Sequence, residues 1–449
     1  MENQSLSKSH TIPGSGHAQN AIMAAKRLFR DFEGNLSIKL WDGSAIYTGT
    51  EKSATVTLAF HSPAAFSRIV LGRDILYLAE CYFNGIVDVE GDIYEALDIR
   101  HYLSSIRLSF REKLYLAIKL LPLQARHKSA CSDISESPPG TLRKHFRDRS
   151  TKAFNKAAVA YHYDVSNDFY RLWLDEQMVY SCAYYEDKTD RLERAQRNKL
   201  DHICRKLRLR RDEKLLDIGC GWGALMFWAA EHYGVNCHGI TLGQEQYEYV
   251  KKQIVSKKLQ QRVSVELLDY RELSGTNIYD KVVSVGMFEH VGLKNMKQYF
   301  SIAHRLLKPG GLFLNHGIAI DTQGWRKSVG TEFINRYVFP DGQLDTVSNI
   351  QKIMEDVGFE IHDVENLRSH YALTLREWVK RLQSRHEEAL HCVSEATYRV
   401  WKLYMAACAE QFEEGGIAVF QVLISKREPY ANPVPLTRHD LYTTTSRPS

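Results

Sequence analysis

The chain has 449 residues, of which 44% are hydrophobic and 25% are charged, values that are ordinary for a soluble globular enzyme. This length predicts two domains rather than one compact core. The net charge of +5 is mild, and no RNA-recognition signature or zinc finger accompanies it, so nucleic acid is not an expected partner.

The N-terminus is polar and lacks an apolar segment, which predicts that the chain carries no signal peptide. No apolar run approaches the length that spans a bilayer. We therefore expect a protein that is either cytoplasmic or bound to a membrane surface. The eight cysteines include no CxxC pair and no zinc-like spacing, so we expect reduced thiols and no metal site.

Residues 1–122 predict a small α+β domain that carries no catalytic constellation. Strand-like runs cover 36–41 and 54–60. A turn-rich passage then begins at Phe83 and leads into a helix near Ile93. We expect this domain to be an accessory to the rest of the chain.

Residues 123–155 predict a basic linker, because the stretch has no periodicity and contains SESPPG. Between Gln124 and Lys156, eight Lys or Arg residues stand against three acidic ones, a net charge of +5. Such a cluster attracts anionic lipid headgroups or nucleic acid. Charge alone favours the simpler interpretation, a solvated linker.

Short apolar runs alternate with helical periods from Lys214 onwards. We expect strands at 215–219, 235–241, 263–269, 279–287 and 312–320, and helices at 224–234, 244–257 and 296–307. A KPGG turn at 308–311 precedes the fifth strand, and two later strands at 359–367 and 418–426 enclose helical stretches at 373–391 and 394–413. The alternation predicts an α/β domain over 156–427 with a parallel, doubly wound sheet, followed by a loose polar tail at 428–449.

The turn after the first of these strands reads DIGCGWG, from Asp217 to Gly223. Glycines at such a turn let a ligand approach the backbone, although they also serve purely structural turns. A dinucleotide enzyme normally has the longer GxGxxG spacing and an acid after the second strand, where this chain has Thr241. The pattern favours a class I S-adenosylmethionine methyltransferase core, in which the buried acid Asp217 suits a cofactor that carries sulfonium and ammonium charges.

Eight motifs occur in order between His162 and Phe412. They are HYDVSNDFYRLWLDEQMVYSCAYY, LLDIGCGWGAL, GITLGQEQ, SVGMFEHVG, HRLLKPGGLFLNH, YVFPDGQL, SHYALTLREW and YMAACAEQF. Together they resemble the cyclopropane fatty acid synthase family, which includes the mycolic acid cyclopropane synthases. The resemblance implies a class I methyltransferase (Rossmann-like) fold with a helical lid. It also implies a lipid-associated role for the N-terminal domain, which is usual in members that act on phospholipids.

The resemblance further implies which residues contact S-adenosylmethionine. Tyr180 and Ser181 would line the pocket, and Gly219, Cys220 and Gly221 would lie beneath the methionine part. Thr241 and Gln246 would approach the ribose, with Gln246 in place of the usual acid, and Tyr270 and Arg271 would flank the adenine. Considered without the resemblance, Tyr270 is equally well interpreted as a surface aromatic residue.

Methylation of an isolated cis alkene places positive charge on the acyl chain, so the site must hold a carbocation without admitting water. Aromatic faces serve both needs. Seven aromatic residues stand upstream of the glycine turn: Tyr161, Tyr163, Phe169, Tyr170, Trp173, Tyr184 and Tyr185. For each of them singly, a place in the ordinary core is the better interpretation.

Ring closure also needs a base, and the resemblance implies a bound bicarbonate ion held by short hydrogen-bonding groups. These groups would be Cys182, Glu289, His316, Tyr371 and the backbone at Ile318. Glu289 follows the fourth strand and His316 ends the fifth, so both are expected at the carboxyl edge of the sheet, where ligands bind. Cys182 is then a polar wall of the anion site rather than an attacking thiolate.

We therefore expect a cyclopropane-fatty-acyl-phospholipid synthase, which transfers a methylene from S-adenosylmethionine across a cis double bond of an unsaturated acyl chain. The alternatives are a related enzyme that gives methyl- or methylene-branched chains, an amine methyltransferase and a lipid-binding protein with a decayed site. The expected partners are membrane phospholipids and the membrane surface, and a homodimer is left open. Cys408 is the other cysteine that the family implicates, although a small core residue is the simpler interpretation.

Overall fold

The computed structural model describes residues 16–49, 54–125, 166–322, 328–338, 343–429 and 432–442. The chain forms two compact units, the first made of Met1–Pro139 with Ser394–Ala407 and the second of Gly140–Val393 with Cys408–Ser449. Most of the predicted basic linker, from residue 126 onwards, lies outside the described residues, as do Tyr161 and Tyr163. In the described part of the chain, no helix combines the length and apolarity needed to cross a membrane.

The first unit contains a four-stranded sheet in the order β2-β1-β3-β4. Its elements are α1 (Gly16–Leu28), β1 (Leu36–Lys39), β2 (Ala45–Thr48), β3 (Val56–Phe60), α2 (Pro63–Gly72), α3 (Ile75–Phe83), β4 (Val87–Gly91), α4 (Ile93–Ser105) and α5 (Phe110–Ala125). Strand β1 is parallel to β3 and antiparallel to β2, and β3 is antiparallel to β4. The mixture of helices and strands agrees with the predicted α+β domain, but β4 lies in the passage that was expected to be only turns.

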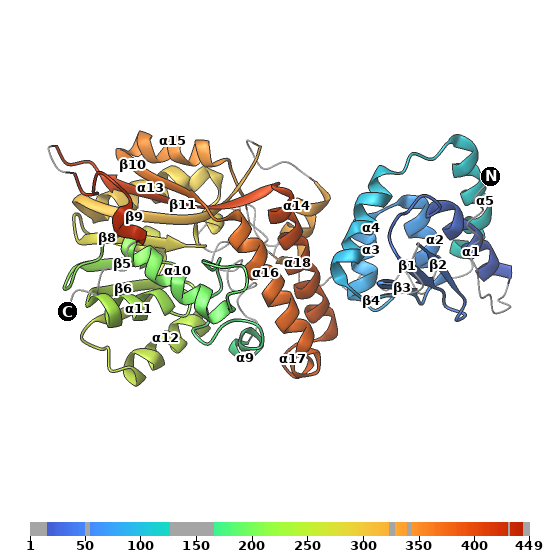
Figure 1. Cartoon of the computed structure of the whole chain (residues 1–449), viewed down its shortest axis with the longest axis horizontal. Coiled ribbons are helices and arrows are strands. Elements are labelled where there is room, and N and C mark those ends of the chain that lie inside the picture. The colour runs from blue at the N-terminus through green and yellow to red at the C-terminus, as the bar shows by residue number, and fades with distance from the viewer. Residues whose placement is uncertain are drawn as a thin grey trace. The chain divides into compact units, whose positions relative to one another are not determined.

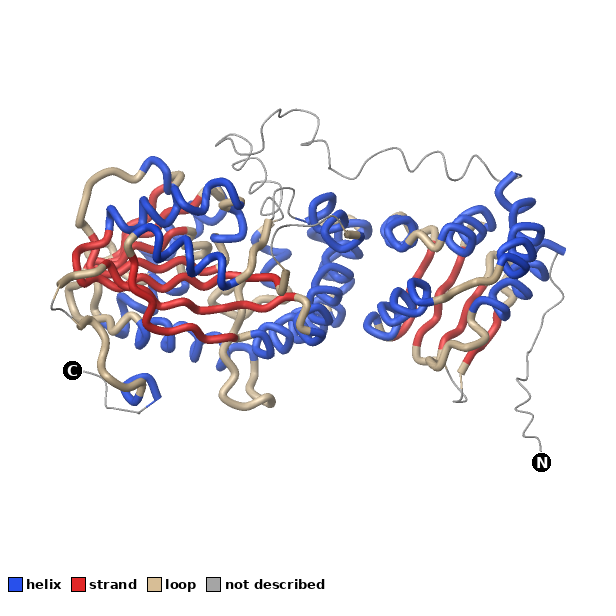
Figure 2. Tube along the Cα trace, turned by 90° about the horizontal axis from the view of Figure 1, so that it is seen from above, coloured by secondary structure: helices blue, strands red, loops and turns tan. Residues whose placement is uncertain are grey.

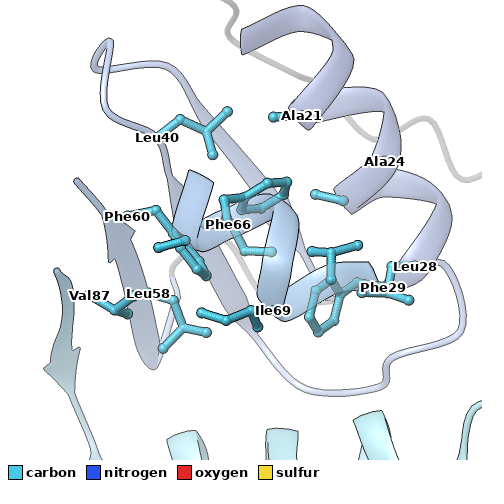
Figure 3. Close-up of a cluster of buried hydrophobic side chains, with 14 of the residues drawn as sticks. Ala21, Ala24, Leu28, Phe29, Leu40, Leu58, Phe60, Phe66, Ile69 and Val87 are labelled. Atoms are coloured by element: carbon cyan, nitrogen blue, oxygen red, sulfur yellow. The ribbon is translucent and has the colours of Figure 1, made fainter. Parts of the chain in front are cut away.

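This unit has a hydrophobic core of its own, which lies between the sheet and the helices (Figure 3). The rings of Phe60 on β3 and Phe66 on α2 meet edge to face with centroids 5.0 Å apart. Helix α1 adds Ala21, Ala24 and Leu28 to the same cluster. Because the cluster is closed by residues of this unit, the packing of its helices is fixed without the second unit.

The second unit is built on a seven-stranded sheet in the order β10-β11-β9-β8-β5-β6-β7. Its strands are β5 (Lys214–Ile218), β6 (Asn236–Thr241), β7 (Val263–Leu267), β8 (Tyr279–Val285), β9 (Leu307–Ile320), β10 (Phe359–Asn366) and β11 (Ile417–Lys426). The strands from β5 to β9 pair in parallel, and β11 runs antiparallel to both β9 and β10. The predicted doubly wound α/β sheet is confirmed.

Helices cover both faces of this sheet (Figures 1 and 2). One face carries α10 (Leu192–Lys206), α11 (Ala224–Tyr233) and α12 (Gln244–Ser256), and the other carries α13 (Met296–Leu306) and α15 (Val347–Val357). The remaining elements are α9 (Asn167–Arg171), the short 3-10 turns η2 (Tyr270–Glu272), η3 (Phe288–His290) and η4 (Leu293–Asn295), α14 (Val329–Phe333), the π-helical turn η5 (Ile334–Val338), α16 (Arg368–Ser384), α17 (His386–Cys392), α18 (Glu395–Glu414) and α19 (His439–Tyr442).

Three elements differ from the sequence-based expectations. The KPGG segment is part of β9, which begins at Leu307 and has an irregular register opposite β8. The helix expected at 373–391 begins earlier and divides into α16 and α17. The tail expected to be loose from residue 428 contains α19, because Leu441 is buried and Arg438 and Asp440 pair with Asp363 and Arg208.

Candidate active site

The glycine turn between β5 and α11 forms the floor of a pocket at the carboxyl ends of the strands. Gly219, Gly221 and Gly223 all have positive φ values, of 83°, 55° and 84°, which glycine adopts more readily than other residues. A Cβ atom added at Gly221 would have no protein atom within 4 Å, because this residue faces the pocket. The turn therefore leaves its backbone accessible to a ligand.

All ten residues expected to contact the cofactor line this one pocket. They are Tyr180, Ser181, Asp217, Gly219, Cys220, Gly221, Thr241, Gln246, Tyr270 and Arg271. They come from the segment before α10, from the turn after β5, from the end of β6 and the start of α12, and from η2 after β7. The sheet topology explains the convergence, because parallel strands bring their carboxyl ends to one edge.

Hydrogen bonds fix several of these side chains in place. The hydroxyl of Thr241 donates to Oε1 of Gln246 over 2.7 Å, which leaves the amide nitrogen of Gln246 available as a donor. The guanidinium of Arg271 donates to both carboxylate oxygens of Asp269, at 2.8 and 2.6 Å. The hydroxyl of Tyr270 is buried and has no partner among the described residues, and burial raises its pKa to about 12. This wall of the pocket therefore offers the uncharged donors of Gln246 and Tyr270, next to Arg271, whose charge is already paired with Asp269.

Lys199 is a pocket residue that the sequence analysis missed. It lies on α10, is only 2% exposed, and its Nζ donates to the hydroxyl of Ser181 over 2.8 Å. No carboxylate of the described residues lies within 4 Å of Nζ, and burial lowers the pKa of Lys199 to about 8. Burial likewise raises the pKa of Asp217 to about 7, although the charge of Lys199 opposes this rise. Its position four residues after Ala195 and four before Ile203, on the buried face of α10, is the signal that could have revealed it.

The aromatic residues upstream of the turn form a packed cluster next to the pocket. The ring of Tyr180 lies 5.6 Å from Tyr170, 5.4 Å from Trp173 and 5.3 Å from Trp378, measured between centroids. Tyr170 also lies 4.9 Å from Trp222. Five of the seven expected aromatic residues are described, namely Phe169, Tyr170, Trp173, Tyr184 and Tyr185, and none of these lines the pocket. Of the rings in this cluster, Tyr180 and Trp222 line the pocket.

Glu289 lies just after β8, next to the end of β9. Glu289 stands in η3 between Met287 and His290, both of which line the pocket. Its Oε1 accepts a hydrogen bond of 2.8 Å from the backbone N–H of Ile318, and its Oε2 is shielded from solvent without a partner among the described residues. Although Glu289 as a whole is half-buried, burial of its carboxyl raises its pKa to about 7. The Ile318 N–H, expected to hold an anion, is therefore occupied by Glu289.

His316 does not end its strand as expected, because β9 continues to Ile320 and pairs with β11 over this length. It is opposite Val285, the last residue of β8, so it still lies at the level of the pocket edge. Burial lowers its pKa to about 3, with a further contribution from the charge of Lys199. The amide of Gln421 donates to its Nδ1 over 3.2 Å, so the neutral ring carries its proton on Nε2. Gln421 is a second residue that the sequence analysis missed.

Cys182 and Tyr371 lie on either side of Leu367. The Cys182 thiol donates to the carbonyl oxygens of Ala183 and Leu367, at 3.2 and 3.8 Å, and burial raises its pKa well above its ordinary value. The backbone N–H of Tyr371, in the first turn of α16, donates to the same Leu367 carbonyl over 3.1 Å. Burial thus favours the protonated form of Cys182, in which a thiol is a poor nucleophile.

Backbone pairing connects Cys182 and Tyr371 to Glu289 and Ile318. Leu367 donates its N–H to Val419 over 2.8 Å, and Val419 is opposite Ile318, the partner of Glu289. Cys408 lies further away on α18, one turn before Phe412, whose ring is 4.7 Å from Tyr371. The structure therefore joins Glu289 to Ile318 directly, with His316 two residues earlier on β9, and connects Cys182 and Tyr371 to them through Leu367 and β11. Cys408 is one helical turn from Phe412, which contacts Tyr371.

Residues 150–422, more than half of the chain, match the family model described as mycolic acid cyclopropane synthetase. The chain belongs to this family. A separate model, described as a domain of unknown function, matches residues 23–105. The predicted resemblance is confirmed, and with it the class I methyltransferase fold.

Individual relatives agree with this membership. A protein of Pseudomonas putida named "probable fatty acid methyltransferase" is 40% identical over 91% of this chain and 96% of its own length. The cyclopropane-fatty-acyl-phospholipid synthase of Escherichia coli is 38% identical over 59% of this chain and 66% of its own length. The structure of mycolic acid cyclopropane synthase CmaA1 complexed with SAH and CTAB is 36% identical, with a TM-score of 0.57 over 60% of this chain and 98% of that one. This member of the family is an S-adenosylmethionine-dependent methyltransferase.

Proposed function

We propose that the protein transfers a methylene group from S-adenosylmethionine across a cis double bond of an unsaturated phospholipid acyl chain. The names of its relatives support an acyl chain as the substrate, since they include a fatty acid methyltransferase and a cyclopropane-fatty-acyl-phospholipid synthase. The observation that carries the proposal is the buried, partnerless Oε2 atom of Glu289 beside the pocket. A methyltransferase that only delivers a methyl group to an amine has no need of a second, dry polar site there.

The charges around the pocket suit the zwitterionic methionine part of the cofactor. Lys199 has no carboxylate partner among the described residues and would pair with the carboxylate of the methionine part, while Asp217 would face its ammonium group. Gln246 and Tyr270 offer free donors for the adenosine part. Because Gly221 has no side chain, it leaves space for the cofactor between these residues. When bound, S-adenosylmethionine supplies an activated methyl group, and these residues hold it in one orientation.

The polar groups beyond the pocket also suit a small hydrogen-bonding anion such as bicarbonate, which when bound supplies a base. An anion next to Glu289 requires that this carboxyl be protonated, and a pKa of about 7 allows it. Neutral His316 would donate from Nε2, and the buried Oε1 of Gln421 would accept a hydrogen bond from the hydroxyl of the anion. Cys182 would contribute a weak S–H donor only by turning it away from the backbone carbonyls that accept it here. The catalytic roles of Cys182, Glu289, His316 and Tyr371 are proposed on this basis, and Cys408 is proposed only as a neighbour of the acyl chain.

Aromatic rings protect a cationic acyl chain in this proposal. Tyr180 lines the pocket, its ring contacts the buried Trp378, and Trp378 lies 6.1 Å from Tyr371, so packed aromatic rings connect the pocket to Tyr371. The faces of such rings stabilise positive charge and exclude water. Aromatic rings, which do not trap a carbocation, therefore lie between the pocket and the polar residues Cys182 and Tyr371.

A second candidate function is transfer that stops at a methyl- or methylene-branched chain. The observation that favours it is the 40% identity with the P. putida protein, which extends over 91% of this chain, whereas the similarity with the E. coli synthase covers 59%. The two functions share the pocket and differ in which proton is removed. They predict different products from the same lipid.

Lipid analysis of a host that expresses the protein tests the proposal. Cyclopropanation adds the mass of one CH2 group to an unsaturated phospholipid and removes its olefinic protons in the NMR spectrum. A methylene branch adds the same mass but keeps olefinic protons. Mass gained with loss of the olefinic signal supports the proposal, mass gained with that signal retained supports the second candidate, and unchanged lipids exclude both.

The cellular setting is proposed together with the substrate. A phospholipid acyl chain lies in a bilayer, so we propose that the protein acts peripherally at the cytoplasmic face of the membrane, with its N-terminal domain and basic stretch near the lipid. The basic residues between Gln124 and Lys156 support this, since their net charge of +5 attracts anionic headgroups. Homodimer formation is proposed as well, and light scattering of the purified chain measures it.

A further inference from the structure

Helix α5 in the first unit exposes a row of large apolar side chains. Phe110 is 80% exposed, Leu114 51%, Ile118 64% and Leu121 52%. Their spacing of four, four and three residues places them on one face, within about 80° around the helix axis. Soluble proteins seldom expose several neighbouring side chains of this size unless the surface binds something. We call this row the α5 stripe.

The opposite face of α5 is already used by the core of the first unit. Leu116, Leu120 and Leu123 are at most 1% exposed and belong to the buried cluster of this unit. The hydroxyl of Ser67 on α2 also donates to the carbonyl of Leu120 over 2.8 Å. The rotation of α5 about its axis is therefore fixed, and the α5 stripe points away from the core. The stripe is outside both matched family models, which end at residue 105 and begin at residue 150.

The charges on α5 indicate the partner. Arg111 and Lys113 are exposed on the two sides of the α5 stripe, and Lys119 is half-buried. The acid of this helix, Glu112, pairs with Arg27 and accepts hydrogen bonds from Ser109, so its charge is compensated within the unit. An apolar face between cations is typical of a helix that lies in the interface of an anionic bilayer.

We propose that the α5 stripe docks on the surface of an anionic phospholipid bilayer. Phe110, Leu114, Ile118 and Leu121 would enter the boundary between headgroups and acyl chains, and Arg111 and Lys113 would meet the phosphates. This inference rests on the proposed phospholipid substrate, because an enzyme that modifies acyl chains must reach them in a membrane. The positive charge of the sequence that follows α5 has the sign that such a surface requires.

Sedimentation of the full chain with vesicles tests the docking. The variant Leu114→Glu with Ile118→Glu should bind vesicles of phosphatidylglycerol and phosphatidylcholine at least tenfold more weakly than the parent. Leu114→Ser with Ile118→Ser should also weaken binding, which shows that lost apolar contact contributes besides added negative charge. The matched control is Val255→Glu with Leu390→Glu, which places the same charges on exposed apolar positions of the second unit. Circular dichroism and calorimetry with S-adenosylmethionine verify that each variant folds.

The outcomes separate docking from the chemistry. Equal sedimentation of the parent and both α5 variants would overturn the docking even if the parent modifies lipids. Weaker sedimentation of the α5 variants supports docking even if the parent yields no lipid product, which would contradict only the proposed function. A change of oligomeric state in the α5 variants with unchanged vesicle binding would assign the stripe to a second copy of the chain and overturn the proposal. With substrate dispersed in detergent micelles, the α5 variants should turn over at the parent rate.

Discussion

Burial sets the charge state of the groups around the pocket. Glu289 and Asp217 are carboxyls with pKa values raised to about 7, and the pKa of Lys199 is lowered to about 8, with burial as the largest cause each time. Groups poised near neutral pH can exchange protons at little cost, as acid–base catalysis requires. The residue types alone carry no such information, because an exposed glutamate titrates far lower.

Glu289→Gln should separate binding from catalysis. The pocket that would hold S-adenosylmethionine is built by other residues, so we expect unchanged cofactor affinity in calorimetry. Turnover on phospholipid vesicles should fall by about 10²–10⁴-fold, since the amide cannot serve as the carboxyl does in positioning a base. Some product should be branched rather than cyclopropanated. Glu360→Gln, on the exposed edge of β10, is the control. Parent-like cyclopropanation by the Glu289 variant would remove this residue from the mechanism.

The same substitution should change how stability depends on pH. The folded Glu289 takes up its proton near pH 7 and an unfolded glutamate near 4.5, so between these values the folded state binds more protons. Its contribution therefore favours folding at low pH and is lost as the pH rises through 7. From about pH 5 to about pH 8, the free energy of unfolding of Glu289→Gln should rise by on the order of 3 kcal/mol relative to that of the parent. Urea unfolding at both pH values measures the difference, and a constant difference would contradict the raised pKa.

Gly221→Val should abolish binding of S-adenosylmethionine. The new side chain would meet no protein atom and would instead fill the pocket, while the positive φ of 55° adds backbone strain. Gly43→Val is the matched control, because Gly43 has a φ of 85° and open space but lies in the first unit. Both variants should lose about 1–3 kcal/mol of stability from strain. A folded Gly221 variant that binds S-adenosylmethionine with parental affinity would contradict the assignment of the glycine turn to cofactor binding.

At the scale of elements, α10 shows how a helix outside the recognised motifs completes the site. Its buried face presents Lys199 to the pocket, and its last turn holds Lys206, which pairs with Asp363 and Glu365 on β10. This helix was not predicted from the sequence, and amphipathic periodicity assigns a lysine to the solvent-facing side. The tertiary fold places α10 against the turn after β5, and this makes Lys199 a buried cation.

Lys199→Met should weaken S-adenosylmethionine binding by about 10- to 100-fold, the worth of a hydrogen bond to a charged group. The affinity of 5′-methylthioadenosine should not change, because this compound lacks the carboxylate that Lys199 would hold. Lys252→Met, at an exposed position of α12, is the control. Calorimetry with both compounds distinguishes the proposed pairing from a general loss of structure. Equal losses of affinity for S-adenosylmethionine and 5′-methylthioadenosine would contradict the pairing of Lys199 with the cofactor's carboxylate.

At the scale of the whole molecule, we propose a different role for each of the two units. The second unit contains every expected contact of the cofactor, and the first has its own core and carries the α5 stripe. The basic stretch of the sequence lies between α5 and the motifs of the second unit. Chemistry and membrane contact are thus proposed for different parts of one chain.

Activity on anionic vesicles should fall as salt is added, since screening weakens the attraction between basic residues and headgroups. Reversing four cations of the basic stretch to Glu should weaken vesicle sedimentation, namely Arg143, Lys144, Arg147 and Arg149. These residues lie outside the described part of the chain, so the prediction depends on their charge alone. Equal sedimentation of both proteins would favour a solvated linker. Cofactor affinity in calorimetry serves as the control.

The sequence by itself determined the doubly wound sheet, because strand and helix periods are local patterns, and the resemblance of its motifs to a known family indicated ten of the residues that line the pocket. Strand and helix periods are short, and the carboxyl ends of parallel strands necessarily converge. Only the tertiary structure decided the partners of side chains that meet across the sheet. It joined Glu289 to Ile318 and His316 to Gln421, and it revealed Lys199 as a buried cation that donates to the Ser181 hydroxyl. These features depend on burial and on contacts between distant segments, and a residue's type does not encode how much water surrounds it.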